Sequence, residues 1–232
     1  MAEYFCSDLH GEYDIFMRLL EKCKISGADT VYVLGDIIDK GKNAFRLLDF
    51  IRKNSVFKPI CGNHEYALLQ IYQNSMTEYD GKNDDIILRK IRDFYPIGGE
   101  SITWDMVDYL DSLPYYLEKP QFICVHAGLK LNADNTIIPL KTQRINDLVF
   151  DRRFKENCVV PDSGKTVLFG HTPCSYDNGT GKFIMTPKKG VIKPEKLTDY
   201  SKIRLDTGIS LTGMAGMLRA DDMREIYIEA LR

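Results

Sequence analysis

Five short apolar segments of the sequence each lead directly into a group of Asp, Asn, His and Gly residues. The segments are Tyr4–Cys6, Val31–Leu34, Val56–Cys61, Phe122–Val125 and Thr166–Phe169. The groups that follow them are Asp8-Leu9-His10-Gly11, Gly35-Asp36-Ile37-Ile38-Asp39, Gly62-Asn63-His64-Glu65, His126-Ala127-Gly128 and Gly170-His171-Thr172. Short apolar runs bounded by turn residues are typical of buried strands, and all four histidines of the chain lie in the groups after them. The sequence therefore predicts strands whose ends carry polar, reactive side chains.

Amphipathic segments with the 3.6-residue period of a helix separate the predicted strands. They cover Tyr13–Cys23, Ala44–Ile51, Asp84–Phe94 and Thr103–Leu113. Strand and helix alternate over the first 61 residues, which predicts two βαβ units. A hairpin is expected from Met217 to Ile228. This order is typical of the α/β class, and we expect residues 1–232 to form one domain.

The composition excludes several classes of protein. With 232 residues, 44% of them hydrophobic, the chain can bury a sizeable core without disulfides or a structural metal. Its net charge of -2 argues against bulk nucleic-acid binding but leaves a local basic patch open. No apolar run approaches the roughly 18 to 20 residues that span a membrane. The six cysteines include no Cys-x-x-Cys pair and no secretory leader precedes them, so we expect a cytoplasmic protein.

The groups at the strand ends supply six candidate metal ligands and no thiolate. They are Asp8, His10, Asp36, Asn63, His126 and His171. A single His or Asp at a strand end is usually a structural cap, but in open α/β sheets such ends converge on one crevice. Mixed nitrogen and oxygen ligands favour Mn²⁺, Fe or Zn²⁺ over a thiolate-rich structural zinc site. Six ligands are too many for one catalytic ion, so they predict two ions that share a carboxylate.

The order and spacing of these groups resemble those of the PPP-type metallophosphoesterases, in particular the small bacterial and bacteriophage serine/threonine protein phosphatases. That family carries Gly-Asp-x-His-Gly, Gly-Asp-x-x-Asp-Arg-Gly, Gly-Asn-His-Glu, His-Ala-Gly and Gly-His-Thr in this order. The corresponding stretches here are SDLHG, GDIIDKG, GNHEY, VHAG and GHT. The resemblance extends from Tyr4 to about Gly208 and implies a sandwich of two mixed β-sheets flanked by helices.

The resemblance also implies a role for each ligand. It places Asp8 and His10 on one ion, Asn63, His126 and His171 on the other, and Asp36 between the two. His64, held by Asp39, would be the general acid, and a hydroxide that bridges the ions would attack the phosphorus.

Phosphate-binding residues are implied in the same way. Arg152 matches the family's phosphate-binding arginine, with Arg153 as the alternative if the alignment shifts by one residue. Asn63 would contact the phosphate as well as an ion. Lys40 stands where the family has a second arginine. Because lysine keeps the charge but cannot form a bidentate contact, we expect a weaker hold on phosphate or an altered choice of substrate.

These observations predict a phosphoric-ester hydrolase that depends on two divalent metal ions, with Mn²⁺ preferred and Fe or Zn²⁺ as alternatives. The expected substrate is a phosphomonoester, above all phosphoserine or phosphothreonine in proteins. Three alternatives are open: symmetrical hydrolysis of dinucleoside tetraphosphates, a phosphodiesterase or nuclease, and a non-catalytic adaptor that keeps the scaffold. The expected partners are phosphoproteins or small phosphorylated molecules, with no membrane, and the sequence leaves the oligomeric state open.

Three further features carry expectations that a structure can test. Asp206-Thr207-Gly208 resembles half of an aspartic-protease site, but the second copy that would form the catalytic dyad is absent. The phosphatase resemblance explains this motif better, because bacterial members often carry Asp-Thr-Gly on a late strand. Cys174 follows His171 by three residues, so a lowered pKa and enhanced reactivity are expected of its thiol. Met185–Lys196 contains four lysines and is expected to be a solvated loop, with a lip that binds the phosphosubstrate as the alternative.

Overall fold

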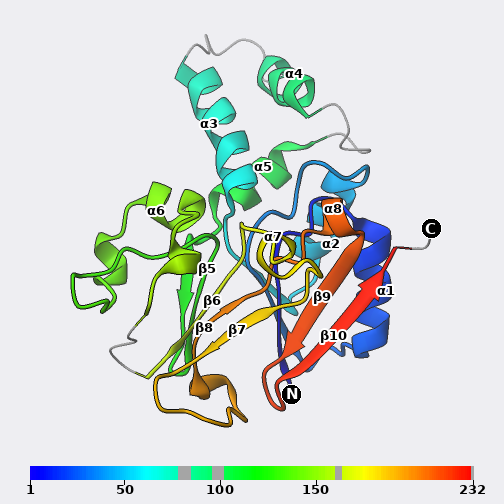
Figure 1. Cartoon of the computed structure of the whole chain (residues 1–232). Coiled ribbons are helices and arrows are strands. Elements are labelled where there is room, and N and C mark those ends of the chain that lie inside the picture. Colours follow the sequence, from blue (N-terminus) through cyan, green and yellow to red (C-terminus); the bar gives the residue numbers. More distant parts are fainter. Residues whose placement is uncertain (78–84, 96–101, 160–163, 231–232) are drawn as a thin grey trace.

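Two β-sheets packed face to face form the centre of the protein (Figure 1). The computed structural model describes residues 1–232 except 78–84, 96–101, 160–163 and 231–232. In spatial order, the first sheet contains β10 (Arg224–Glu229), β9 (Met214–Arg219), β1 (Glu3–Cys6), β2 (Thr30–Val33) and β3 (Phe57–Pro59). The second sheet contains β4 (Tyr116–Glu118), β5 (Phe122–Val125), β6 (Thr166–Phe169), β8 (Tyr200–Arg204) and β7 (Ile184–Pro187). Each sheet has parallel central strands and antiparallel strands at its edge, so both are mixed.

The central strands are continuous apolar runs because both of their faces are buried. In the first sheet Phe5 pairs with Tyr32, and their rings stack with centroids 5.0 Å apart. Phe122 of the second sheet meets the Phe5 ring edge-on at 4.9 Å, which joins the two sheets. Tyr4 and Cys6, the neighbours of Phe5, face the opposite side and pack into the core beneath the helices.

Helices cover the outer faces of both sheets (Figure 1). The core outside the first sheet includes α1 (Tyr13–Cys23), α2 (Ala44–Lys53), α3 (Asn63–Thr77), α4 (Asp85–Phe94) and α5 (Trp104–Asp111). The outer face of the second sheet packs against α6 (Ile145–Phe150) and the 3₁₀ turn η2 (Phe154–Glu156). The remaining short helices are η1 (Leu140–Thr142), α7 (Ser175–Asn178), η3 (Leu197–Asp199) and α8 (Ile209–Thr212). In the part of the chain that the structure describes, no helix combines the length and the apolar character needed to cross a membrane.

The predicted sandwich of two mixed sheets flanked by helices is confirmed. The helix at Tyr13–Cys23 and the strands at Phe122–Val125 and Thr166–Phe169 have the predicted bounds. The strand predicted at Val56–Cys61 is shorter and spans Phe57–Pro59. A proline has no N–H to donate, so it commonly lies where strand pairing ends.

The expectation of a solvated loop at Met185–Lys196 is wrong for its first residues. Ile184–Pro187 form β7, which pairs with β8 at the edge of the second sheet. An edge strand pairs on one side only, and the residues of β7 are accordingly half-buried or exposed, although Ile184 and Met185 are apolar. β4 and β8 also have no counterpart among the predicted strands. Asp84, the first residue of one predicted helix, lies outside the described residues.

A buried lysine connects β8 to the segment that follows α6. Lys202 is 6% exposed, and its Nζ donates to the carbonyl oxygens of Phe154, Lys155 and Asn157 at 3.1, 2.6 and 2.6 Å. Burial lowers the pKa of Lys202 to about 8, so at pH 7 the ammonium group is still mostly charged and has three protons for three acceptors. The contact fixes the backbone directly after Arg152.

Replacing Lys202 by Met is expected to lower the free energy of unfolding by about 2–3 kcal/mol, because three buried carbonyls lose a charged donor. Urea unfolding followed by circular dichroism measures this difference. Lys193→Met is the matched control, since the Lys193 side chain is 86% exposed. If the two variants were equally stable, water would have to replace the ammonium group at these carbonyls.

Candidate metal centre

Polar groups that follow four of the five predicted strands line one cleft at the carboxyl ends of the strands, with a volume of about 160 Å³. His126, which follows the fifth predicted strand, does not line the cleft, but its Nε2 lies 3.5 Å from Asp36. The charged and polar residues that line it are His10, Asp36, Lys40, Asn63, His64, Arg152, His171, Ser210 and Asp206. Residues from distant parts of the sequence, such as His10 and His171, are therefore neighbours, as the strand-end pattern predicted.

Several of the predicted site residues have left-handed backbone conformations. Positive φ angles between 44° and 72° occur at His10, Asp8, Asp36, Lys40, His171 and Asp39. A left-handed conformation costs a residue with a side chain about 1 kcal/mol or more, and such strain is concentrated at functional sites. The loops turn sharply at these residues, and four of them, His10, Asp36, Lys40 and His171, line the cleft.

Glu65 holds two of these loops together. It is fully buried, and its carboxylate accepts hydrogen bonds from the backbone N–H groups of Asp36, Ile37, Ile38 and Gly62 at 2.8 to 3.1 Å. The loops approach so closely at Gly62 that a Cβ atom there would lie 2.3 Å from Oδ1 of Asp36. The glycine and the glutamate of the Gly-Asn-His-Glu group thus position Asp36 without contacting the cleft themselves.

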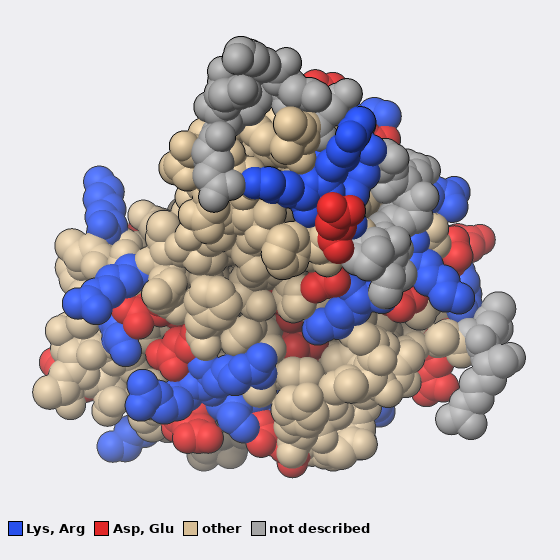
Figure 2. Space-filling model, turned by 90° about the horizontal axis from the view of Figure 1, so that it is seen from above, with Lys and Arg blue, Asp and Glu red and all other residues tan. Residues whose placement is uncertain are grey.

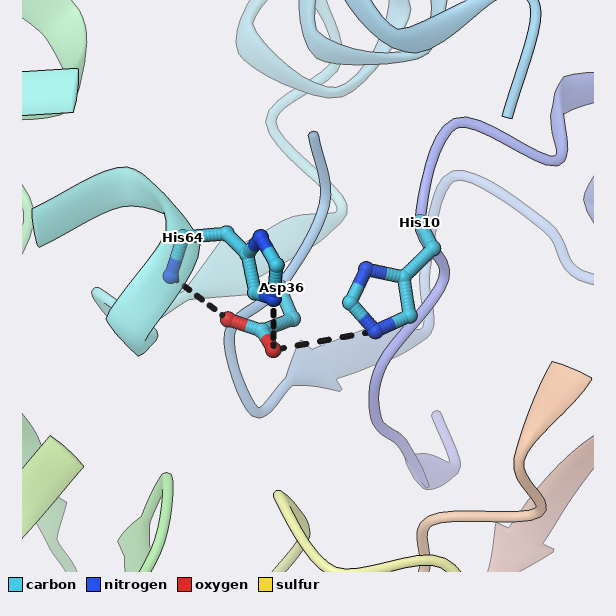
Figure 3. A group of neighbouring side chains, drawn as sticks. All are labelled: His10, Asp36 and His64. Carbon is cyan, nitrogen blue, oxygen red and sulfur yellow. Dashed lines mark hydrogen bonds and ion pairs between the residues drawn. The ribbon is translucent and has the colours of Figure 1, made fainter. Parts of the chain in front are cut away.

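Asp36 lies between two groups of candidate ligands. Figure 3 shows its carboxylate between the rings of His10 and His64, whose Nε2 atoms are both 3.7 Å from Oδ2. Its other oxygen, Oδ1, is 3.5 Å from Nε2 of His126. Ligand atoms of His10, Asp36 and His64 lie within 4.8 Å of one another, and so do those of Asp36, His126 and His171. One carboxylate that faces two clusters is the geometry expected of a bridging ligand.

In the second cluster, nitrogen and oxygen atoms with lone pairs lie close together, and a cation could bind them. Nδ1 of His126 lies 2.7 Å from the carbonyl oxygen of Leu34, which holds the proton there and leaves Nε2 as an acceptor. That Nε2 lies 2.9 Å from Oδ1 of Asn63, and Nδ1 of His171 lies 2.7 Å from the same oxygen. Among the described residues, Nε2 of His171 is buried without a hydrogen-bond partner. The donor set therefore fits a metal ion with nitrogen and oxygen ligands.

The electrostatics of the site also fit bound cations. Burial and the neighbouring Asp8 raise the pKa of Asp36 and of Asp206 far above the usual range. Burial would also raise the pKa of Asp8, but the nearby imidazoles of His126 and His10 lower it. Burial lowers the pKa of His10 to about 4, so its ring is neutral at pH 7 and available as a ligand. Three buried carboxylates that influence one another, Asp8, Asp36 and Asp206, are costly unless positive charge compensates them.

His64 and Asp39 form a hydrogen-bonded pair at the edge of the cleft. Nδ1 of His64 lies 2.6 Å from Oδ2 of Asp39. Burial opposes protonation of His64, but the bond to Asp39 and the charge of Asp36 outweigh it and raise the pKa. The pair thus favours an imidazolium whose Nε2 is directed toward Asp36.

The candidate phosphate-binding cations differ in whether they line the cleft. Arg152 lines the cleft, whereas Arg153 lines a separate hollow with Asp151. Lys40 also lines the cleft, and its Nζ donates to Nε2 of His10 at 2.7 Å. Seen from above, the basic side chains that Figure 2 colours are interspersed with acidic ones and with uncharged surface. The candidate phosphate-binding cations that line the cleft are thus Arg152 and Lys40.

Two residues in the later part of the chain, Cys174 and Asp206, have surroundings that their local sequence did not reveal. Cys174 is fully buried, and burial raises its pKa to about 12, so the expectation of a reactive thiolate is wrong. Asp206 lines the cleft although the sequence analysis gave it no role. It lies two residues after the end of β8, so it follows a strand end as the other polar groups of the site do. Tyr176 and Leu211 also line the cleft. No motif in the sequence around them marks them as site residues.

This fold, together with the neighbouring groups of His and Asp at the ends of its strands, is typical of the metal-dependent phosphoesterases. The chain belongs to the calcineurin-like phosphoesterase family, whose sequence model matches residues 4–192.

Two known relatives are similar to this chain over part of their length. The symmetrical bis(5'-nucleosyl)-tetraphosphatase of Vibrio vulnificus (strain CMCP6) is 28% identical over 178 residues, which cover 73% of this chain and 62% of the relative. That of Dechloromonas aromatica (strain RCB) is 29% identical over 131 residues, 56% of this chain and 44% of the relative. The chain thus matches less than two thirds of the length of these relatives.

Solved structures agree with the fold. A crystal structure of a protein predicted to be a diadenosine tetraphosphatase superimposes with a TM-score of 0.71 at 17% identity, covering 100% of this chain and 94% of the other. A protein serine/threonine phosphatase from Saccharomyces cerevisiae superimposes with a TM-score of 0.58 at 15% identity, covering 100% and 81%. At these identities the likeness concerns the fold alone.

Proposed function

We propose that the protein is a two-metal phosphohydrolase that cleaves dinucleoside tetraphosphates symmetrically. The reaction class rests on one observation, that the two oxygens of Asp36 face two separate ligand clusters. The substrate rests on the relatives named above, which are symmetrical bis(5'-nucleosyl)-tetraphosphatases. This reverses the order that the sequence analysis preferred, in which phosphoserine and phosphothreonine came first.

In this proposal the metal ligands divide as the motifs imply. One ion would be held by Asp8 and His10, the other by Asn63, His126 and His171, and both by Asp36. When bound, two such ions polarise phosphoryl oxygens and generate a nucleophile from water at neutral pH. Mn²⁺ is the proposed metal because the ligands are hard and include no thiolate, with Fe and Zn²⁺ as the alternatives.

The other residues of the cleft have roles that follow from their placement. Arg152 and Lys40 would bind the non-bridging phosphate oxygens, where negative charge is spread in the transition state, and the amide of Asn63 would add a contact. His64 would donate its Nε2 proton to the departing oxygen while Asp39 keeps the ring in the required orientation. The presence of every ligand together with the His64–Asp39 pair argues against a non-catalytic adaptor.

The proposal predicts a substrate preference that can be measured directly. With Mn²⁺ added, the protein is expected to hydrolyse diadenosine tetraphosphate with a kcat/KM at least about tenfold above that for a phosphoserine peptide, a difference of about 1.4 kcal/mol in transition-state binding. Chromatography should show two molecules of ADP per substrate. ATP with AMP would indicate asymmetrical cleavage, and faster peptide hydrolysis would make the protein a serine/threonine phosphatase. Bis-p-nitrophenyl phosphate tests the diesterase alternative.

Two remaining predictions concern the partner of the protein and its location in the cell. A phosphorylated small molecule or phosphoprotein is the partner that a phosphohydrolase requires. The cytoplasmic location stays a prediction that rests on the cysteines.

A further inference from the structure

The cleft is lined by two unlike sets of side chains. The residues assigned to metal and phosphate are charged or polar, whereas the remainder of the lining includes Pro173, Tyr176 and Leu211. Tyr176 and Leu211 are each 64% exposed. Large apolar side chains exposed together beside a polar site mark a place where an apolar group of a ligand can bind.

Tyr176 is held on a rigid support. It belongs to the short helix α7, where the next residue, Asp177, pairs with the buried guanidinium of Arg204 and with Lys155 at 2.8 Å. At the start of α7, the N–H of Cys174 donates to the carbonyl oxygen of Asp206 at 2.8 Å. The backbone that carries the exposed ring is thus fixed on both sides, so little conformational entropy would be lost when the ring binds a ligand.

Leu211 lies on a segment that packs directly against this support. Ile209 of α8 is buried, and Oγ1 of Thr212 donates to the carbonyl oxygens of Thr207 and Gly208 at 3.2 and 3.1 Å. A Cβ atom on Gly208 would lie 3.0 Å from Cβ of Pro173, the residue that precedes Cys174. Figure 1 shows α7 and α8 next to each other near the strand ends. Tyr176 and Leu211 therefore belong to one apolar wall of the cleft.

We propose that Tyr176 and Leu211 bind a nucleobase of the substrate, with the base stacked on the tyrosine ring while its phosphates occupy the polar part of the cleft. The inference rests on the proposed function, because a dinucleoside tetraphosphate joins flat aromatic bases to a phosphate chain. Stacking on an aromatic ring accepts any base. The wall therefore favours nucleoside polyphosphates as a class over phosphates that lack a base.

Binding of ADP and of inorganic pyrophosphate tests this wall independently of turnover. Calorimetry in the presence of Mn²⁺ is expected to show that wild type binds ADP more tightly than pyrophosphate. Tyr176→Ala should weaken ADP binding by between about 5- and 100-fold and pyrophosphate binding by far less. Tyr176→Phe should bind ADP like wild type, because the ring remains, and Leu211→Ala should show a smaller loss than Tyr176→Ala.

Ile192→Ala is the matched control, since Ile192 is an apolar side chain that is 99% exposed and does not line the cleft. It should bind both probes like wild type. The inference is overturned if Tyr176→Ala weakens ADP and pyrophosphate equally, or weakens neither. Failure of the proposed function has a different signature, in which wild type leaves diadenosine tetraphosphate intact while the contrast between ADP and pyrophosphate in Tyr176→Ala persists.

Discussion

Asp36→Asn is expected to reduce the metal content from two ions per chain to one or none and to lower turnover by on the order of a thousandfold or more. The carboxylate oxygens of Asp36 face different clusters, Oδ2 toward His10 and Oδ1 toward His126. An amide has the same shape but one acceptor oxygen and no charge, so it cannot serve both clusters. Elemental analysis of dialysed protein, measured beside the rate of p-nitrophenyl phosphate hydrolysis, checks both effects.

A second measurement separates lost metal from lost structure. Without metal, Asp36→Asn should unfold at a higher temperature than wild type, because it removes one of several buried carboxylates that repel one another. Asp222→Asn, in the β9–β10 turn where Asp222 pairs with Arg219, is the matched control and should keep both metals and full rate. An Asp36→Asn protein that still bound two ions would show that Asp36 does not bridge them.

His64→Asn is expected to keep both metal ions and to lose about a hundredfold to ten-thousandfold in turnover of a phosphoserine peptide, whose alkoxide leaving group needs a proton. His64 is bonded to Asp39 through Nδ1, and its Nε2 is 3.7 Å from Asp36. The same geometry would allow His64 to be a ligand, because its nitrogen is as near to Asp36 as that of His10. Metal content decides between the two roles, since a general acid can be lost without releasing an ion.

The size of the His64→Asn effect should depend on the leaving group. A nucleoside diphosphate or a nitrophenolate departs as a weak base and needs little help from an acid, whereas a serine alkoxide needs a proton. Hydrolysis of a phosphoserine peptide should therefore suffer more than hydrolysis of p-nitrophenyl phosphate. Asp39→Asn, which leaves the imidazole without its partner, should show a smaller loss with the same dependence. Release of metal from His64→Asn would contradict the assignment.

Much of the fold and of the candidate site could be predicted because its signals are local. The central strands are buried on both faces, so Phe122–Val125 and Thr166–Phe169 stand out as apolar runs. The groups after them place His126 and His171 next to strand ends, and strand ends of an α/β sheet share one edge. No contact between distant segments had to be known for these steps.

Other features depend on contacts that no local pattern encodes. The edge strand β7 opens with the apolar residues Ile184 and Met185, but its residues are only half-buried or exposed because one of its sides has no partner strand. Cys174 is close to His171 in sequence, but it is buried and its thiol donates to the carbonyl oxygen of Arg204, 30 residues away. Asp206 follows β8, and β8 is recognisable as a strand only from its pairing with β6 and β7.

The α/β class, the family resemblance and the set of candidate ligands follow from the amino-acid sequence, because each of these depends on short motifs in a fixed order. Three further features emerge from the folded chain: Asp36 faces two clusters, Arg152 lines the cleft while Arg153 does not, and Tyr176 and Leu211 share a wall. They could not be predicted because the directions of side chains in a site are set by packing between segments far apart in the chain, such as the close approach of Gly208 to Pro173.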